Sequence, residues 1–190
     1  MSETAVRRLT AIVAADVFGY SRLIAADEEA TLAHLRGHRS QLIDPLVAKH
    51  GGRIANTAGD SLLIEFPSVV EALRFAVAMQ KGIEARNSDV PEPKQLIFRV
   101  GINLGDVVEQ DGDLLGDGVN VAARIEALAK RGLVFARQGA EFTAQLLQNA
   151  GSSSRIANPH LLDGLGVVTG LLEVGEKGSL DRLQSLDAHR

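Results

Sequence analysis

The stretch LTAIVAAD, residues 9–16, sets the beginning of the fold. Its apolar, partly β-branched residues predict a buried strand, and this strand ends at Asp16, before the turn-forming sequence FGYS at residues 18–21. A second carboxylate, Asp60, lies in AGDS at residues 58–61, between two apolar stretches, and this sequence suits a tight hairpin turn. Two predicted strand ends therefore each carry an aspartate.

Helical patterns separate these strands. Asp27 and the two glutamates after it are typical of a helix N-terminus, and leucine, isoleucine and valine residues then recur on one face up to the Gly51–Gly52 pair. Pro45 is expected to kink or restart this helix. The sequence SVVE at residues 68–71 has the form of a capping box, which predicts a second helix to about Arg86.

The second half of the chain continues the alternation. We expect a strand at 97–108, a hairpin loop at 111–113, a helix at 119–130, a strand at 132–136, a helix at 141–149 and a loop at 151–159. No element is predicted beyond residue 159. The order of elements favours an α+β fold, in which helices pack on a palm-like mixed sheet with a ferredoxin-like core.

Composition limits the classes of function. A chain of 190 residues corresponds to about one domain, and it has no cysteine for thiol chemistry or disulfides. No apolar run approaches the ~20 residues of a membrane span, and no secretory signal is present, so a cytoplasmic location is expected. The net charge of -4 gives no global field for DNA or RNA, so no nucleic-acid partner is expected.

His34 and His38 have the i, i+4 spacing of a metal-binding pair. They lie beside Arg36 and Arg39, and no third ligand is near in sequence. A solvated helix face is therefore the expected setting of both histidines.

Asp16 and Asp60 form the first candidate site. A lone carboxylate at an apolar strand end is costly unless it is paired, hydrogen-bonded or neutralised by a metal ion. Mg²⁺ is usually held by one or two carboxylates together with substrate phosphates. The alternative interpretation is that each aspartate caps its own turn, and the spacing by itself favours this alternative.

Asn120 and Arg124 form the second candidate site, within GDGVNVAAR at residues 116–124. Residues four apart share one helix face, and an arginine fork near a helix N-terminus suits phosphate oxygens. The alternative is a solvated helix face with Asn120 near the N-cap.

Four segments of the chain form a spaced set: AADVFGYS at 14–21, NTAGDS at 56–61, FRVGINLG at 98–105 and DLLGDGVNVAAR at 113–124. They occur in the same order and spacing as the motifs of class III nucleotidyl cyclase catalytic domains, and the chain resembles the bacterial adenylate cyclase type most closely. The resemblance extends from about residue 8 to 130 and is weaker beyond.

The resemblance implies a single catalytic domain at 8–190, after a short tail at 1–7, that works as a head-to-tail homodimer with shared active sites. It implies that Asp16 and Asp60 bind two Mg²⁺ or Mn²⁺ ions per site, and that Asn120 and Arg124 act on ATP from the partner chain. Asp113 matches the carboxylate that reads adenine. The products would be 3',5'-cyclic AMP and pyrophosphate.

Two positions depart from the family pattern. Asn56 stands where adenylate cyclases of this type usually place a lysine that contacts adenine, so it either reads the base without charge or is a strand residue. Lys177 is a faint match to the triphosphate-binding lysine, or else a solvated loop residue.

Two alternative functions stay open. One is a catalytically weak or silent nucleotide-binding module that regulates a partner, and the other is a palm-fold enzyme that makes another nucleotide product.

Overall fold

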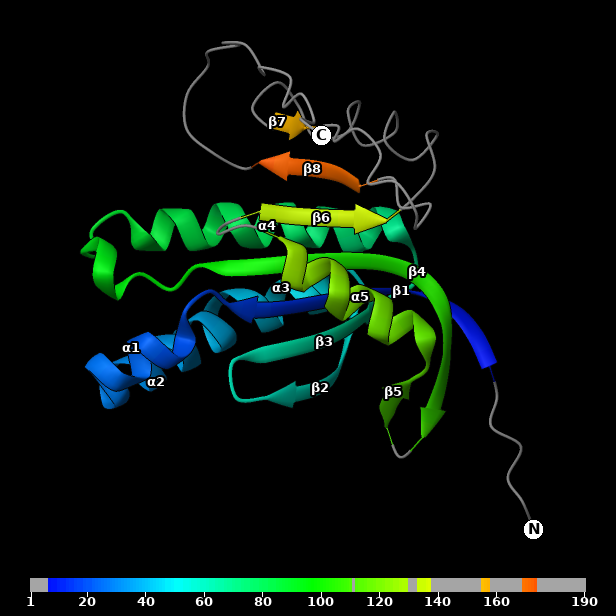
Figure 1. Cartoon of the computed structure of the whole chain (residues 1–190), viewed down its shortest axis with the longest axis horizontal. Coiled ribbons are helices and arrows are strands. Elements are labelled where there is room, and N and C mark those ends of the chain that lie inside the picture. Colours follow the sequence, from blue (N-terminus) through cyan, green and yellow to red (C-terminus); the bar gives the residue numbers. More distant parts are fainter. Residues whose placement is uncertain (1–6, 111, 130–132, 138–154, 158–168, 174–190) are drawn as a thin grey trace, which may run out of the picture.

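An eight-stranded mixed sheet forms the centre of the computed structural model, which describes residues 7–110, 112–129, 133–137, 155–157 and 169–173 (Figure 1). Seven strands follow the order β2-β3-β1-β4-β6-β8-β7, and β5 pairs with β4. The strands are β1 Arg7–Val17, β2 Arg53–Ala58, β3 Ser61–Phe66, β4 Phe98–Gln110, β5 Asp113–Leu115, β6 Leu133–Arg137, β7 Arg155–Ala157 and β8 Thr169–Glu173.

Strand β1 is central. It pairs antiparallel with β3 on one side and with β4 on the other, and the β1–β4 register runs from the pair Arg7/Val108 to the pair Val17/Phe98. Strand β4 pairs parallel with β6, which makes the sheet mixed. The long β1–β4 ladder is the frame on which the helices pack.

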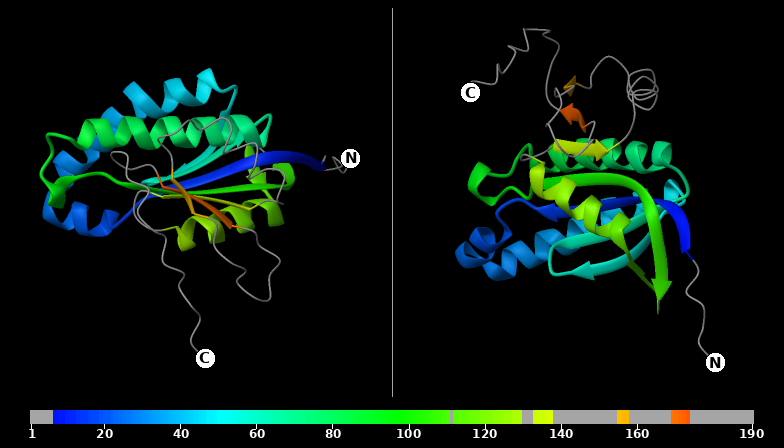
Figure 2. Two further views of the ribbon diagram at one scale, coloured as in Figure 1. Left: turned by 90° about the horizontal axis from the view of Figure 1, so that it is seen from above. Right: turned by 45° about the vertical axis from the view of Figure 1, so that its right-hand side comes forward.

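Helices cover both faces of this sheet. Figure 2 shows α4 on one side and α5 on the other, and α1, α2 and α3 contribute Leu23, Leu35 and Val47 to the core under α4. The helices are α1 Tyr20–Ala26, α2 Glu28–His38, a π-helical turn Arg39–Ile43, α3 Asp44–Lys49, α4 Val69–Asn87, a 3₁₀ turn Glu92–Lys94 and α5 Asp117–Leu128. The result is the α+β mixed sheet with packed helices that the sequence predicts.

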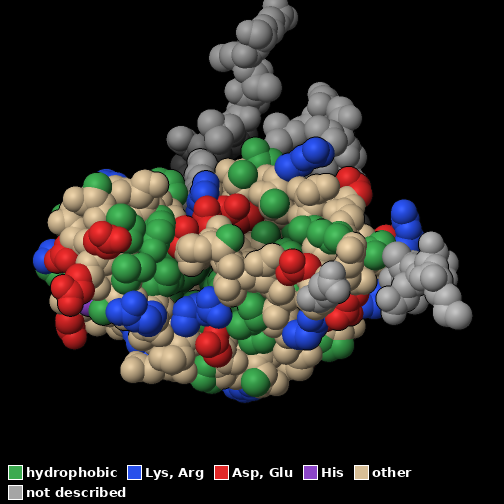
Figure 3. Space-filling view, turned by 90° about the horizontal axis from the view of Figure 1, so that it is seen from below, with side chains coloured by type: hydrophobic (Ala, Val, Ile, Leu, Met, Phe, Trp, Pro, Cys, Tyr) green, Lys and Arg blue, Asp and Glu red, His purple; other side chains and the backbone are tan. Residues whose placement is uncertain are grey.

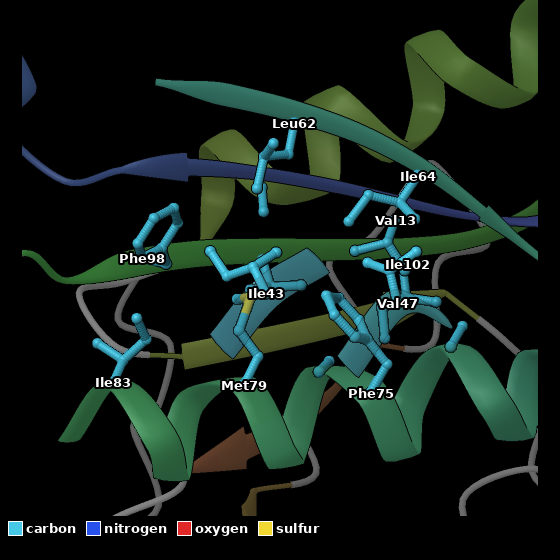
Figure 4. Close-up of a cluster of buried hydrophobic side chains, with 14 of the residues drawn as sticks. Val13, Ile43, Val47, Leu62, Ile64, Phe75, Met79, Ile83, Phe98 and Ile102 are labelled. Atoms are coloured by element: carbon cyan, nitrogen blue, oxygen red, sulfur yellow. The ribbon is translucent and has the colours of Figure 1, made fainter. Parts of the chain in front are cut away.

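The alternation of β1 gives each face its own core. Successive strand residues point to opposite faces, so Ala11, Val13 and Ala15 join the core under α4, whereas Ile12 and Ala14 join the smaller core with Ala122 of α5. In the larger core, α4 directs three large side chains at the sheet, which Figure 4 labels: Phe75, Met79 and Ile83. Burial on both faces explains why β1 is apolar almost throughout.

Most local signals are confirmed. Asp27 caps α2 by accepting a hydrogen bond from the Ala30 amide at 3.1 Å, and Ser68 caps α4 by accepting one from the Glu71 amide at 3.2 Å. Pro45 lies in the first turn of α3, directly after the π-helical turn, as expected for a proline at which the helix restarts. The hairpin turn between β2 and β3 contains Gly59 at φ 62°, a left-handed conformation that glycine adopts without strain.

Three expectations need correction, and a fourth stays untested. Part of the predicted turn at 18–21 is the start of helix α1, and residues 155–157 form strand β7 rather than loop. Strand β8 was not anticipated. The helix expected at 141–149 lies outside the described residues.

The expected solvated setting of His38 is wrong. Its side chain is buried against the core, at 7% exposure, and its Nδ1 has no hydrogen-bond partner among the described residues. Burial, with the nearby charge of Arg86 and the proximity of His34, lowers the pKa of His38 to about 4. The helix face that carries His38 therefore turns inward at this point.

The burial of His38 predicts that the free energy of unfolding depends on pH. Because its pKa is about 4 in the folded chain and about 6.5 when unfolded, the unfolded chain binds a proton that the folded chain does not. The free energy of unfolding should therefore fall by about 3 kcal/mol from this group as pH drops from 7 to 4. Urea unfolding of wild type and His38→Leu across this range measures the difference. His34→Gln, on the exposed side of α2, is the control and should keep the wild-type slope; a His38→Leu slope equal to wild type would contradict the assignment.

Candidate active site

Asp16 and Asp60 lie together at one end of the β1–β3 pair. Asp16 is the penultimate residue of β1, and Asp60 is in the turn between β2 and β3. The Asp60 Oδ2 accepts a hydrogen bond from the Val17 amide at 3.0 Å, which fixes the turn against the end of β1. The tertiary structure thus joins two carboxylates that are 44 positions apart in sequence.

Burial raises the pKa of Asp60, and the charge of Asp16 raises it further, while the hydrogen bond from the Val17 amide acts in the opposite direction. A cation between the two carboxylates would relieve this repulsion. The electrostatics of the pair therefore favour binding of a positive group.

Arg99 supplies one such positive group. Arg99 of β4 lies directly opposite Asp16 in the antiparallel register. Its guanidinium donates two hydrogen bonds to the Asp16 carboxylate, from Nε to Oδ1 at 3.0 Å and from an Nη to Oδ2 at 2.6 Å. This is the bidentate geometry that makes arginine–carboxylate pairs strong, and hydrogen bonding to Asp16 raises the pKa of Arg99.

Glu126 of α5 completes the cluster. Its Oε1 lies 3.0 Å from the Arg99 Nε, yet this buried oxygen has no properly oriented hydrogen bond among the described residues. Burial, together with hydrogen bonding and charge at Asp16, raises the pKa of Glu126 to about 7. Three carboxyl groups and one guanidinium, those of Asp16, Asp60, Glu126 and Arg99, therefore meet where β1, β4, the β2–β3 turn and α5 converge.

The sequence analysis missed Arg99 and Glu126. A signal was present for Arg99, because it is a charged residue inside the apolar stretch of β4, between Phe98 and Val100. A buried charge in a strand calls for a partner. The identity of that partner depends on the β1–β4 register, which a single sequence does not give.

Close packing of α5 on β4 brings Glu126 to this cluster. A Cβ built on Gly101 would lie 2.3 Å from the Glu126 amide nitrogen and 2.4 Å from the Ala122 carbonyl oxygen. Only glycine permits that approach. The Asn103 side chain also donates to the Gly118 carbonyl at 2.9 Å, which fixes the start of α5.

Asn120 and Arg124 lie on a different face of α5. Both side chains are exposed, whereas Ala122 and Ile125 are buried against the sheet. At 100° per residue, Arg124 and Glu126 point about 160° apart around the helix axis. The structure therefore does not bring Asn120 and Arg124 to Asp16 and Asp60 within one chain.

The candidate base-reading residues come from neighbouring elements. Asn56 is exposed on the edge strand β2, and Asp113 is half-buried at the start of β5. Strands β2 and β5 contact each other, and Arg53 of β2 donates to the Gly112 carbonyl before β5 at 2.8 Å. Lys177 lies outside the described residues.

Charges are mixed over the surface around these elements. In the face that Figure 3 shows, acidic and basic side chains of the described residues alternate, without a broad field of one sign. This distribution agrees with the small net charge of the chain. Recognition of a polyanionic substrate therefore depends on local groups.

The donor set at Asp16 and Asp60 fits a divalent cation of the Mg²⁺ type. Such an ion is held by one or two carboxylates and completes its shell with water and substrate phosphates. The repulsion that raises the pKa of Asp60 is what such an ion would offset. Among the described residues, no group of three or more His, Cys, Asp or Glu side chains is placed to hold a metal ion.

Comparison with known proteins identifies the family. Residues 6–170 match the description "Adenylate and Guanylate cyclase catalytic domain". The chain is 50% identical over 133 residues to "Putative adenylate cyclase 3" of Rhizobium meliloti, across 70% of this chain and 23% of that protein. It is 33% identical over 132 residues to an adenylate cyclase of Streptomyces coelicolor, across 70% of this chain and 33% of that protein. The chain thus spans a third or less of the length of these two relatives.

Solved structures agree with this match. The adenylate/guanylate cyclase/hydrolase from Silicibacter pomeroyi superposes with a TM-score of 0.76 at 36% identity, over 91% of this chain and 100% of that one. The adenylyl cyclase CyaB from P. aeruginosa shares the fold, with a TM-score of 0.68 at 21% identity over 93% of this chain and 98% of that one. The chain therefore belongs to the adenylate and guanylate cyclase catalytic-domain family, the class III nucleotidyl cyclases.

Proposed function

We propose that this chain is an adenylate cyclase domain that converts ATP to 3',5'-cyclic AMP and pyrophosphate. The observation that carries the proposal is the meeting of Asp16 and Asp60 at the end of β1, where the Val17 amide holds Asp60 in place. Both curated relatives described above have adenylate cyclase in their names, which supports ATP as the substrate.

The reaction forms one bond and breaks one. The ribose 3'-oxygen attacks the α-phosphorus and loses its proton, and the bond from the α-phosphorus to the bridging oxygen breaks, so that its electron pair leaves with pyrophosphate. Two Mg²⁺ or Mn²⁺ ions at Asp16 and Asp60 would lower the pKa of the 3'-hydroxyl and offset charge on the triphosphate. Arg124 would stabilise charge at the transferring phosphoryl group, and Asn120 would orient the ribose.

The two faces of α5 support a homodimer with shared sites. Asn120 and Arg124 are exposed and point away from the sheet, whereas Asp16 and Asp60 are half-buried at its edge. One chain cannot serve ATP with both pairs, but two chains packed head to tail could. We therefore infer that each site takes Asp16 and Asp60 from one chain, and Asn120 and Arg124 from its partner.

Asn56 and Asp113 would read the purine. Their strands contact each other, and Asp113 can accept a hydrogen bond from the exocyclic amine of adenine. Lys177 is the proposed contact for the triphosphate. Because Asn56 is uncharged, it can donate to a ring nitrogen only through a neutral hydrogen bond.

A second candidate function is a silent nucleotide-binding module that regulates a partner. One observation favours it: both oxygens of Asp16 already accept hydrogen bonds from Arg99.

No helix in the described part of the chain is long and apolar enough to cross a bilayer. A cytoplasmic location and the absence of a nucleic-acid partner remain predictions.

Product analysis tests the proposed function directly. Incubation with Mn²⁺ and ATP should give cyclic AMP and pyrophosphate, separated by chromatography, and Asp16→Ala or Asp60→Ala should reduce the rate by at least ~100-fold because each removes a metal ligand. Circular dichroism and thermal melting check that both variants remain folded. Arg8→Gln, which removes an ion pair at the other end of β1, is the matched control. Wild-type rates in either aspartate variant at saturating Mn²⁺ would refute the metal assignment.

Complementation tests the shared site. Asp60→Ala and Arg124→Ala should each be inactive alone, because each homodimer then lacks one half of both sites. After subunit exchange, half of the dimers are mixed and each carries one intact site, so the mixture should recover about a quarter of the wild-type rate. Exchange is confirmed independently by fluorescence transfer between labelled subunits. A mixture that exchanges but stays inactive would rule out sites shared in this way.

Asn56→Lys tests the base pocket. If Asn56 faces the purine, lysine supplies a charge-assisted hydrogen bond, roughly twice as strong as a neutral one, and kcat/KM for ATP relative to GTP should rise about tenfold. Thr57→Lys adds the same charge one residue along, on the opposite side of the strand, and should leave the ratio unchanged. An equal ratio in wild type and Asn56→Lys would place Asn56 outside the pocket.

A further inference from the structure

The sheet bends strongly at the end that carries β5. Val108 of β4 pairs with Arg7 of β1 on one side and with Leu115 of β5 on the other, so β5 continues the strand order β2-β3-β1-β4. In a flat sheet, four strand spacings would separate β2 from β5 by about 19 Å. The two strands nevertheless contact each other, and Figure 1 shows the far end of β4 bending toward the level of β2. The sheet therefore closes partly on itself, around the smaller core.

A ring of four charged side chains lies across this closure, with one residue from each of four strands. Arg8 of β1 and Arg53 of β2 each contact both Glu65 of β3 and Glu109 of β4. Glu65 is the most buried member, with a side-chain exposure of 12%. Burial acts to raise the pKa of Glu65, but hydrogen bonds from Arg53 and Arg8 outweigh it and lower this pKa. Glu65 therefore stays ionised and holds both arginines.

Arg53 extends this charged ring to the turn before β5. Its Nε donates to the Glu65 Oε1 at 2.6 Å, and its Nη1 donates to the Gly112 carbonyl at 2.8 Å. Its Nη2 lies 3.2 Å from the Glu109 Oε1. In the described part of the chain, Arg8 contacts the two glutamates of the ring, whereas Arg53 also binds the turn. Arg53 is thus a cross-link between β2 and the turn before β5.

A β-bulge places Asn56 on the same face of β2 as Arg53. Arg53 pairs with Glu65, and after a shift in register Asn56 pairs with Leu63. Glu65 and Leu63 are two residues apart and share one face of the sheet, so their partners share it too. Without the extra residue of the bulge, residues three apart would point to opposite faces. The bulge therefore orients Asn56 to the side on which Arg53 makes its contacts.

The other end of the cross-link adjoins Asp113. The carbonyl that Arg53 binds is that of Gly112, in the peptide bond that leads into Asp113. Partly exposed ion pairs add little to the free energy of unfolding, so the main consequence of this cross-link is geometric. It sets the distance between β2 and the start of β5.

We propose that Arg53 is a positioning residue for base recognition: its guanidinium ties β2 to the turn before β5 and thereby holds Asn56 and Asp113 at the separation that fits one purine. The proposal rests on the proposed function, since it requires that both residues contact the base. In this role Arg53 makes no contact with the nucleotide itself. The preference for adenine then depends on a residue outside the base pocket.

Nucleotide binding without turnover provides the test. In α,β-methylene ATP a carbon replaces the bridging oxygen, so the bond that the proposed reaction breaks is absent. Its purine riboside counterpart also lacks the exocyclic amine of adenine. Calorimetry in the presence of Mn²⁺ gives the dissociation constant of each analogue. We expect wild type to bind the adenine analogue about tenfold more tightly, because Asp113 accepts a hydrogen bond from the amine.

Arg53→Gln should lower this ratio of affinities to less than ~threefold, while the affinity for the analogue without the amine changes by less than ~twofold. Arg8→Gln is the matched control. It removes the same charge from beside the same two glutamates but leaves the bond to the Gly112 carbonyl intact, so it should keep the wild-type ratio. Equal weakening of both analogues in Arg53→Gln would indicate a purely structural role and overturn the proposal.

A double-mutant cycle checks that Arg53 acts through Asp113. In an Asp113→Ala background the contact with the amine is already lost, so adding Arg53→Gln should weaken binding of the adenine analogue by less than ~twofold. Weakening as large as in the wild-type background would show that Arg53 acts by another route, against the proposal.

A conservative variant guards against loss of folding. Arg53→Lys keeps a charge beside Glu65 but lacks the planar fork that binds Glu65 and Gly112 together. Its ratio should be as low as that of Arg53→Gln, with a melting temperature close to that of wild type. A wild-type ratio in this variant would assign the effect to charge alone and contradict the cross-link.

Failure of the proposed function gives a different result. A wild type that binds both analogues equally would overturn the base pocket and this proposal with it. A wild type that prefers the adenine analogue but forms no cyclic AMP from ATP would refute the proposed reaction alone.

Discussion

The antiparallel pairing of β1 with β4 is the constraint on which the rest of the structure depends. Its register continues without a break from Arg7/Val108 to Val17/Phe98. The ladder places apolar side chains of both strands on each face, so that helices can pack on both sides. It also sets Arg99 opposite Asp16, so the same register that builds the core decides which cation meets which carboxylate.

Helix α5 connects the core to the chemistry. Its sheet-facing side approaches β4 so closely that Gly101 has no space for a Cβ, and this approach carries Glu126 into the charged cluster. Its outer side presents Asn120 and Arg124 to solvent. A helix with two such faces can serve one site through its buried side and another through its exposed side, which is the physical basis of the proposed dimer.

At this end of the sheet, the same charged groups bear on both the stability of the fold and the proposed binding of a cation. Desolvation raises the pKa of Asp60 and Glu126, and the charge of Asp16 adds to both. A single guanidinium offsets this repulsion only in part, because Arg99 satisfies Asp16, while an oxygen of Glu126 finds no hydrogen bond in the described part of the chain. An arrangement of this kind is suited to accept a further cation, since a divalent ion would relieve what the protein leaves unbalanced.

Local signals in the sequence determined much of this protein. The first strand, the hairpin turn around Asp60, the caps at Asp27 and Ser68 and the α+β class all follow from patterns within a few residues, and the structure has each of them, with the strand ending one residue after Asp16. The family was also accessible from sequence, because four spaced motifs carry it.

Only the tertiary structure decided the rest, because it depends on contacts between distant segments. The inward turn of His38, the partnership of Arg99 with Asp16 and the entry of Glu126 each require a strand register or a helix docking that no local pattern encodes. Helix α1 and strand β7 were missed for a related reason, since short elements gain most of their stability from tertiary packing and pairing rather than from their own residues. The sequence alone therefore identified the carboxylates at the strand ends, whereas the tertiary structure determined which charged groups surround them.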